Sequence, residues 1–287
     1  KKNKTKTIFT YFSSTEPLLI NPVANSPVSY DYSYMIYDYI ISSKLSNDNF
    51  NLSQSAIGSY INIGPIYSDL IIEAKKNLNI IKNKNYINSY EKIITCFDNT
   101  FGYGGTQSKL EYLNYLDAIG NACNNYKNFL FLFKNKKKFE DINSFLGTDG
   151  EILIKKIKSY KNFKIAEELD ITTYELIGVS ELIVTVPLSS IIYESLAGKV
   201  KTIIYDSDKK SAKLGTPSAK FPNINSSNSS NFIQCLNHWL NEVSKIDFEK
   251  YLENNIEGLV NISNNNFEFF LINRYNQTIK KILNNLN

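Results

Sequence analysis

The sequence has one histidine and three cysteines among its 287 residues. His238 stands in the apolar helical stretch 235–240, where a packed, hydrogen-bonded ring is the simpler interpretation. Cys96, Cys123 and Cys235 are far apart and no pair has the spacing of metal ligands, so we expect three reduced, buried thiols. These shortages argue against a Ser-His-Asp or Cys-His catalytic arrangement. Any catalysis must then depend on carboxylates, hydroxyls, lysines or binding energy.

A strong charge excess and long apolar runs are also missing. The formal net charge is only +4, which argues against a dedicated nucleic-acid binder. No apolar run approaches the roughly 20 residues of a membrane span, and the basic start at residues 1–4 is not followed by a signal-peptide core. We therefore expect a soluble cytoplasmic protein, which could still work at the inner face of the cell membrane.

What is present from residue 92 onward is a regular alternation of strands and helices. Strands are expected at 92–97, 129–133, 163–166, 182–186 and 201–205, with helices at 110–124, 150–160, 172–179 and 190–197. Such alternation predicts right-handed βαβ units, and the continuous apolar runs are typical of strands buried on both faces. The predicted fold is therefore α/β, a doubly wound parallel sheet.

The flanking regions are less regular. Ahead of the sheet we expect a strand at 7–12, a Tyr-rich helix at 30–41, a short strand at 60–63 that a Gly-Pro turn ends, a helix at 66–78 and a linker at 79–90. After the sheet, the Ser/Asn-rich stretch 223–231 is expected to be a solvated loop, followed by mostly helical chain.

Three segments follow predicted strands and meet at the edge where such sheets bind ligands. The first contains Gly102, Gly104, Gly105 and Thr106, which let the backbone turn tightly before a helix begins. A helix start of this kind can hold an anion, which favours a diphosphate cradle. A flexible surface loop is the alternative, because neither the dinucleotide nor the P-loop fingerprint is complete.

The second segment supplies Lys134 and Lys136, directly after a strand. Lysine can neutralise phosphate as a point charge, although a lysine run after a strand is also a common solvated turn.

The third segment is the most specific. A strand ends at Pro187, Ser189 and Ser190 precede the next helix, and Glu194 follows one turn later. The serines could cap the helix or meet an incoming phosphate. Glu194 could accept hydrogen bonds from ribose hydroxyls or simply stabilise its helix.

This third segment resembles the C-terminal donor-binding domain of GT-B glycosyltransferases. The matching motifs are Ser-Glu-Leu before a strand at 180–182, the Ser-Ser pair at 189–190, Glu-Ser-Leu-Ala-Gly at 194–198, and a strand ending in Asp206. It looks most like bacterial surface-polysaccharide transferases. The Ile-Gly-Pro-Ile-Tyr stretch at 63–67 is similar to the short strand that precedes the donor domain in these relatives.

The resemblance implies a nucleotide-sugar donor as substrate, no cofactor and no metal. Ribose would lie near Glu194, and the diphosphate would lie at Gly104, Gly105, Thr106, Ser189 and Ser190. The domains would be a shortened acceptor-side segment (1–78), a Rossmann-like donor domain (79–240) and C-terminal helices (241–287). A glycan or lipid-linked acceptor would complete the reaction. The acceptor base is unassigned, with Glu16 and Asp31 as N-terminal candidates.

Two rival interpretations stay open. The chain could be a non-catalytic nucleotide-sugar-binding or scaffold module derived from a GT-B enzyme, as the short N-terminal part and the missing histidine would favour. A sugar-nucleotide epimerase shares the architecture, but it would need acid–base carboxylates and usually a histidine that we do not find.

Overall fold

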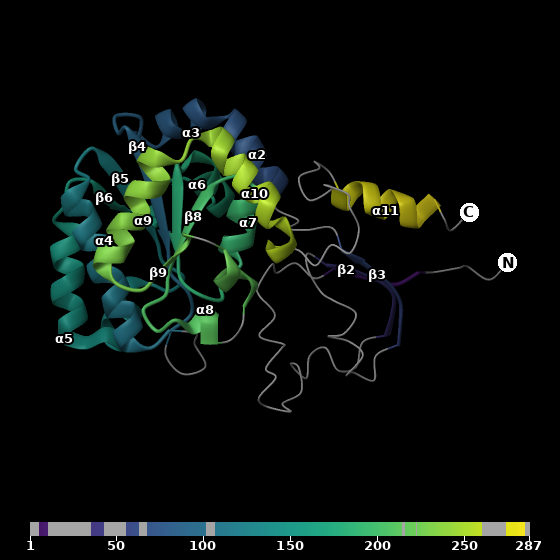
Figure 1. Cartoon of the computed structure of the whole chain (residues 1–287), viewed down its shortest axis with the longest axis horizontal. Helices are drawn as coiled ribbons and strands as arrows, with labels where there is room; N and C mark the ends of the chain where they lie inside the picture. Colours follow the sequence, from purple (N-terminus) through teal and green to yellow (C-terminus); the bar gives the residue numbers. More distant parts are fainter. Residues whose placement is uncertain are drawn as a thin grey trace.

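The computed structural model describes residues 6–10, 36–42, 56–62, 68–101, 107–213, 216–221, 223–259 and 274–284. Two groups of elements can be followed in Figure 1: a large sheet enclosed by helices, and a small sheet of strands from the N-terminal part beside the last helix. The large group contains the described residues for which the sequence predicted ligand contacts: Lys134, Lys136, Pro187, Ser189, Ser190 and Glu194.

The large sheet has six parallel strands in the order β6-β5-β4-β7-β8-β9. These are β4 (Lys92–Phe97), β5 (Phe129–Lys134), β6 (Phe163–Ile165), β7 (Leu182–Thr185), β8 (Lys201–Tyr205) and β9 (Asn225–Ser226). The chain winds outward from β4 to β6, returns to the other side of β4, and continues from β7 to β9. The strand order therefore reverses between β4 and β7. This is the doubly wound, Rossmann-like fold predicted from the sequence.

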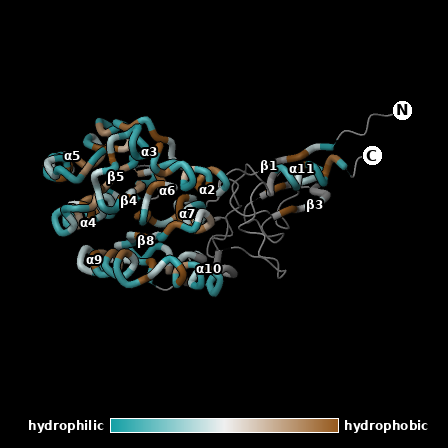
Figure 2. The backbone as a smooth tube through the Cα atoms, turned by 90° about the horizontal axis from the view of Figure 1, so that it is seen from above, coloured by the Kyte–Doolittle hydropathy of each residue, from teal (hydrophilic) through white to brown (hydrophobic). Residues whose placement is uncertain are grey.

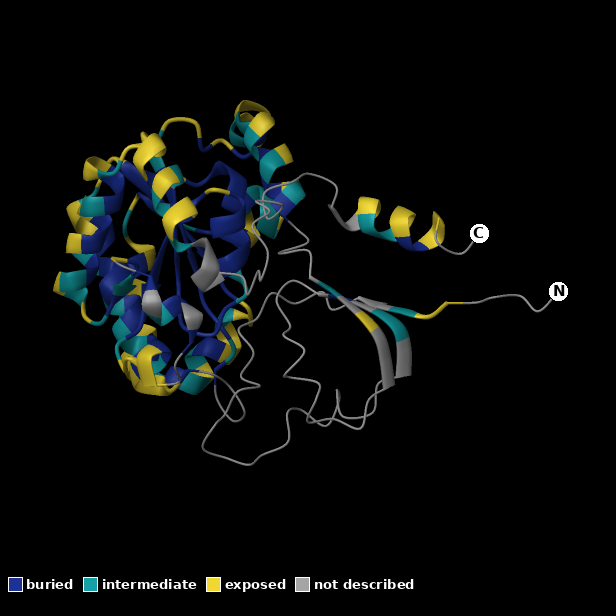
Figure 3. Cartoon of the chain, turned by 45° about the vertical axis from the view of Figure 1, so that its right-hand side comes forward, coloured by how far each residue is buried: buried dark blue, intermediate teal, exposed yellow. Residues whose placement is uncertain are grey.

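Alternation within the strands explains why helices cover both faces of this sheet. In β5, Phe129, Phe131 and Phe133 belong to one hydrophobic core, whereas Leu130 and Leu132 belong to the other. Successive side chains of a strand point to opposite faces, so a wholly apolar strand needs an apolar layer on each side. Figure 3 shows the result, with buried strands at the centre and exposed residues on the outer helix faces.

Each core is closed by its own set of helices. One side is covered by α4 (Lys109–Asn125), α5 (Phe139–Lys158), α9 (Ser229–Asn237) and α10 (Lys245–Leu259), and the other by α2 (Ser68–Lys76), α3 (Leu78–Lys84) and α6 (Thr173–Val179). The view from above in Figure 2 places α2 and α3 on one side of the strands and α9 and α10 on the other. The short helices α7 (Ile191–Ala197) and α8 (Lys210–Lys213) follow β7 and β8.

The small group is a parallel three-stranded sheet, β1 (Ile8–Thr10), β2 (Ile36–Ser42) and β3 (Ala56–Asn62), with α11 (Arg274–Asn284). Ile282 of α11 packs with Ile41 of β2 in a core of their own. The helix expected at 30–41 is therefore wrong for the part that the structure describes. Its β-branched and aromatic residues suit a strand, and pairing with β1 and β3 decided the outcome.

Three further expectations need correction. The predicted linker at 79–90 contains most of α3, because Ile81 and Ile87 are buried against the sheet. The stretch 223–231, expected to be a loop, contains strand β9 and the start of α9. The helix expected at 150–160 is the second part of the longer α5, which is interrupted at Gly147, where φ is +68°. The other strands and helices of the large sheet lie within a few residues of their predicted positions.

The cysteines are placed as expected from the sequence, and the histidine is placed so in part. All three cysteines are buried free thiols. The His238 side chain is about one-third exposed, with Nδ1 2.8 Å from a Glu242 carboxylate oxygen, so it is hydrogen-bonded but less packed than expected. None of the helices in the described part of the chain combines the length and apolar character needed to cross a bilayer.

Candidate functional site

A cleft of about 530 Å³ opens at the carboxyl ends of β4, β5 and β7, where the strand order reverses. It is lined by Phe97, Asp98, Asn99, Lys134, Asn135, Lys136, Glu167, Thr173, Leu188, Ser189, Ser190 and Ile191. The residues after neighbouring parallel strands meet at this edge, so segments almost 100 positions apart in sequence share one cavity. This is the place where open α/β sheets bind ligands.

Four residues selected from the sequence line this cleft: Lys134, Lys136, Ser189 and Ser190. Pro187 and Glu194 do not line it, and Glu194 is buried within α7. Gly102, Gly104, Gly105 and Thr106 lie outside the described residues, as do Glu16 and Asp31. The described ends of the glycine-rich segment, Phe101 and Gln107, are both buried and form a β-bridge.

Asp98 follows β4 and holds the neighbouring connection in place. Its carboxylate accepts hydrogen bonds from the Tyr112 hydroxyl at 2.6 Å and from the Lys136 backbone N–H at 2.7 Å. Burial raises the pKa of Asp98 to about 7, although both hydrogen bonds and the nearby lysine charges act in the opposite direction. Asp98 thereby ties the start of the β5–α5 connection to the end of β4.

Asn99 also connects neighbouring segments, here the residues that follow β7 and β5. Its side-chain amide donates to the Leu188 carbonyl at 3.2 Å, and its Oδ1 accepts from Lys136 Nζ at 3.4 Å. Leu188 has φ of +63°, a conformation that costs a branched residue roughly 1–2 kcal/mol. The surrounding contacts therefore hold a strained turn directly before Ser189 and Ser190.

The third wall of the cleft is a polar network after β5 and β6. Glu167 forms an ion pair with Lys134 at 3.2 Å and accepts from the Asn135 amide at 2.8 Å. Asn135 is 1% exposed, and its Oδ1 has no hydrogen-bond partner among the described residues. Lys136, in contrast, makes no salt bridge within the described parts of the chain, and its side chain is exposed.

The serine pair does not cap α7 in the expected way. Ser190 is the N-cap residue, but its φ of −61° and ψ of −26° are helical and its side chain makes no capping hydrogen bond. Its hydroxyl hydrogen-bonds to the Glu194 carboxyl instead, which lowers the pKa of that group. Burial has the larger effect and raises the pKa of Glu194 to about 7.

No protein-family model matches the chain, and no curated protein sequence matches it. Several solved structures, in contrast, match the chain. The wall teichoic acid polymerase TagF superposes with a TM-score of 0.59 at 14% identity, over 98% of this chain and 70% of TagF. The fold is similar to that of TagF. A TagF variant soaked with CDPG gives a TM-score of 0.53 at 16% identity, over 87% of this chain and 57% of TagF.

At these identities the likeness to TagF establishes the fold, which is the GT-B type that the motifs at 180–206 predicted. The likeness assigns no role to any individual residue of this chain.

Several lining residues are not among those predicted from the sequence, because the patterns used there were glycine clusters, lysine runs and serines before helices. Asp98, Asn99 and Asn135 directly follow β4 and β5, and Glu167 follows β6. The rule that ligands bind at the carboxyl ends of strands would have selected all four. No group of three or more His, Cys, Asp or Glu side chains in the described ranges could hold a metal ion.

Proposed function

We propose that this chain is a glycosyltransferase that binds a nucleotide-activated donor in the cleft at the β4–β7 reversal, in the synthesis of a cell-surface polysaccharide. The observation that carries the proposal is the meeting of Lys134, Lys136, Ser189 and Ser190 in one cavity. Its volume of about 530 Å³ is within the roughly 300–1,000 Å³ of small-molecule and cofactor sites.

The charges of the cleft suit a phosphate. The Lys134 charge is shared with Glu167, whereas Lys136 Nζ contacts the neutral amide of Asn99. The Ile192 and Tyr193 N–H groups at the start of α7 already donate to the carbonyls of the preceding serines, so the positive charge of the cleft comes from the lysines. In glycosyl transfer, negative charge develops on the departing nucleotide phosphate in the transition state. Cationic groups that are already in place stabilise this charge.

The likeness to TagF supports the choice of pathway. TagF is a wall teichoic acid polymerase, and one of its structures was soaked with CDPG. We therefore expect the acceptor to be a glycan or a lipid-linked chain. That the reaction needs neither a cofactor nor a metal stays a prediction. The ribose contact of Glu194 stays a prediction.

Calorimetric titration with UDP, CMP and GDP tests the proposal. At least one nucleotide should bind, and Lys136→Ala should weaken it by about tenfold, the effect of losing about 1.4 kcal/mol. Lys138→Ala is the matched control, because Lys138 belongs to the same basic run but does not line the cleft. Undetectable binding of all three nucleotides, or equal losses in the two variants, would refute the proposal.

Incubation with sugar nucleotides then separates enzyme from binding module. Release of the nucleotide in the presence of a glycan acceptor supports transfer. Tight binding with no turnover would instead favour the non-catalytic module.

A further inference from the structure

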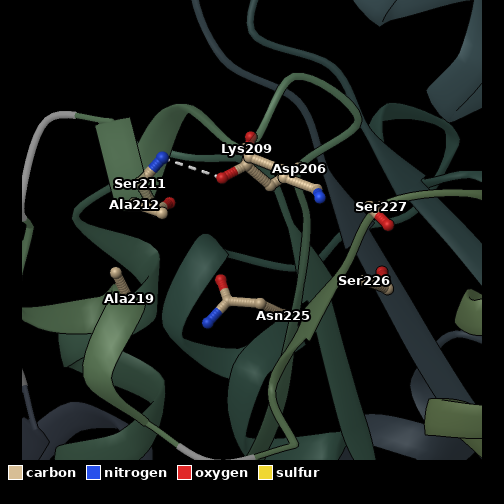
Figure 4. A pocket seen from close by; sticks show the side chains of 8 residues that line it. All are labelled: Asp206, Lys209, Ser211, Ala212, Ala219, Asn225, Ser226 and Ser227. Atoms are coloured by element: carbon tan, nitrogen blue, oxygen red, sulfur yellow. Dashed lines mark hydrogen bonds between the residues drawn. The ribbon is translucent and has the colours of Figure 1, made fainter.

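A second, smaller pocket lies at the same edge of the sheet, beyond β8 and β9. It has a volume of about 220 Å³ and is lined by Asp206, Lys209, Ser211, Ala212, Ala219, Asn225, Ser226 and Ser227. Figure 4 shows Asn225 projecting into the space between Ala219 and the Asp206–Ser211 pair. None of these residues lines the larger cleft.

Most polar groups of this pocket already have partners. The Asp206 carboxylate accepts from the backbone N–H groups of Lys210 at 2.7 Å and Ser211 at 2.8 Å. The Asn225 amide nitrogen donates to the Ser218 carbonyl at 3.1 Å, and the Ser226 hydroxyl donates to the Ile204 carbonyl at 3.3 Å. These contacts fix the walls of the pocket.

Two oxygens are different. Ser211 Oγ and Asn225 Oδ1 are buried and have no hydrogen-bond partner among the residues that the structure describes. Ser211 as a whole is only 1% exposed. A buried polar atom without a partner is costly, so two of them in one pocket indicate that a ligand supplies the missing hydrogen bonds.

The size and charge of the pocket narrow the class of that ligand. At about 220 Å³ it is smaller than the roughly 300 Å³ at which small-molecule and cofactor sites begin, which excludes a whole nucleotide. One carboxylate, Asp206, and one ammonium, Lys209, give a balanced lining, so an anion has no advantage there. The amide oxygen of Asn225 can only accept a hydrogen bond, and the ligand must therefore donate one. Ala212 and Ala219 add apolar wall.

We propose that this pocket binds one neutral polyhydroxylated unit, such as a single sugar ring. Hydroxyl groups would donate to Asn225 Oδ1 and exchange a hydrogen bond with Ser211 Oγ, while the C–H groups of the ring pack against the alanines. The pocket is tied to the start of α4 by an ion pair between Lys210 and Glu111 at 2.6 Å. Because adjacent strands lie about 4.8 Å apart, it is only on the order of 10 Å along the sheet edge from the larger cleft.

Ligand-observed NMR with methyl α-glucoside tests this assignment on the full chain. The glycoside should bind with millimolar affinity, and Ser211→Ala should weaken it at least tenfold. Because the Ser211 hydroxyl has no partner to lose, this variant should melt at the same temperature as the wild type or higher. That result separates loss of a ligand contact from loss of structure. Ser230→Ala, which changes an exposed serine of α9, should alter neither property.

Filling the pocket gives a second, independent variant. Ala212 lines the pocket yet is an exposed residue, so Ala212→Leu should abolish glycoside binding while the fold is kept. Both variants should leave nucleotide binding in the larger cleft unchanged, so the two sites can fail separately. Unchanged glycoside binding in Ser211→Ala and Ala212→Leu, or inorganic phosphate binding this pocket in preference to the glycoside, would overturn the assignment.

Discussion

The buried carboxyl of Glu194 gives a sharp prediction about pH and stability. Glu194 is 4% exposed, and burial raises its pKa from 4.5 to about 7. The folded protein therefore holds this proton more tightly than the unfolded chain does. The resulting stabilisation is complete below pH 4.5 and is lost as the pH rises to about 7. At 1.36 kcal/mol per pKa unit, the loss is on the order of 3 kcal/mol.

Replacing Glu194 by Gln removes the titrating group and keeps its shape. The stability of Glu194→Gln relative to the wild type should rise with pH, by about 2–3 kcal/mol between pH 5 and pH 9. At ~2–4 °C per kcal/mol, this corresponds to roughly 4–12 °C in melting temperature. Asp98, whose pKa is raised in the same direction, adds a similar slope to both proteins, so only their difference isolates Glu194.

Urea unfolding of both proteins across this pH range measures the difference. Glu168→Gln, which makes the same substitution at an exposed side chain, is the control. A difference between Glu194→Gln and the wild type that does not change with pH would show that the carboxyl is not desolvated as the structure indicates.

Two further substitutions test the packing around the sheet. In Gly178→Ala, the new Cβ would lie 2.5 Å from the Ala74 Cβ and 3.0 Å from the Ile71 carbonyl oxygen, so α2 and α6 must separate. Urea unfolding should show a loss of about 1–3 kcal/mol, and an unchanged midpoint would contradict this close approach. Tyr86→Gly should instead raise the melting temperature, because Tyr86 is 83% exposed and has φ of +53°. The gain should be up to about 1 kcal/mol, and a lower melting temperature would argue against strain there.

The sheet could be predicted where burial of a strand on both faces produces an unbroken apolar run in the sequence. The apolar runs of β4 and β5 are examples, because five of the six residues in each strand are buried. Strand β9 has no such run, since it consists of Asn225 and Ser226 and depends on backbone hydrogen bonds to β8. In the stretch 30–41, tyrosine and isoleucine fit either a helix or a strand. Pairing with distant strands, which a local pattern does not contain, decided between them.

The candidate site could be predicted only in part, for a related reason. Lys134, Lys136, Ser189 and Ser190 were found because each directly follows a recognisable strand or precedes a recognisable helix. Contacts made across the sheet could not be found in this way, such as the bond from Asn99 to the Leu188 carbonyl. Nor does the sequence show that Ser190 turns its hydroxyl toward Glu194 rather than toward the helix backbone.

The hydrogen bond from the Lys136 backbone to Asp98 affects the entropy cost of ligand binding. Immobilising one residue costs about 1–2 kcal/mol in conformational entropy. Here that cost falls on folding, since the connection after β5 is already anchored to the end of β4. An arriving molecule therefore finds this wall preformed, and little affinity is lost to ordering it. Such a preformed wall selects ligands by shape, and loss of the hydrogen bond between Asp98 and the Lys136 backbone should weaken binding by loosening that wall.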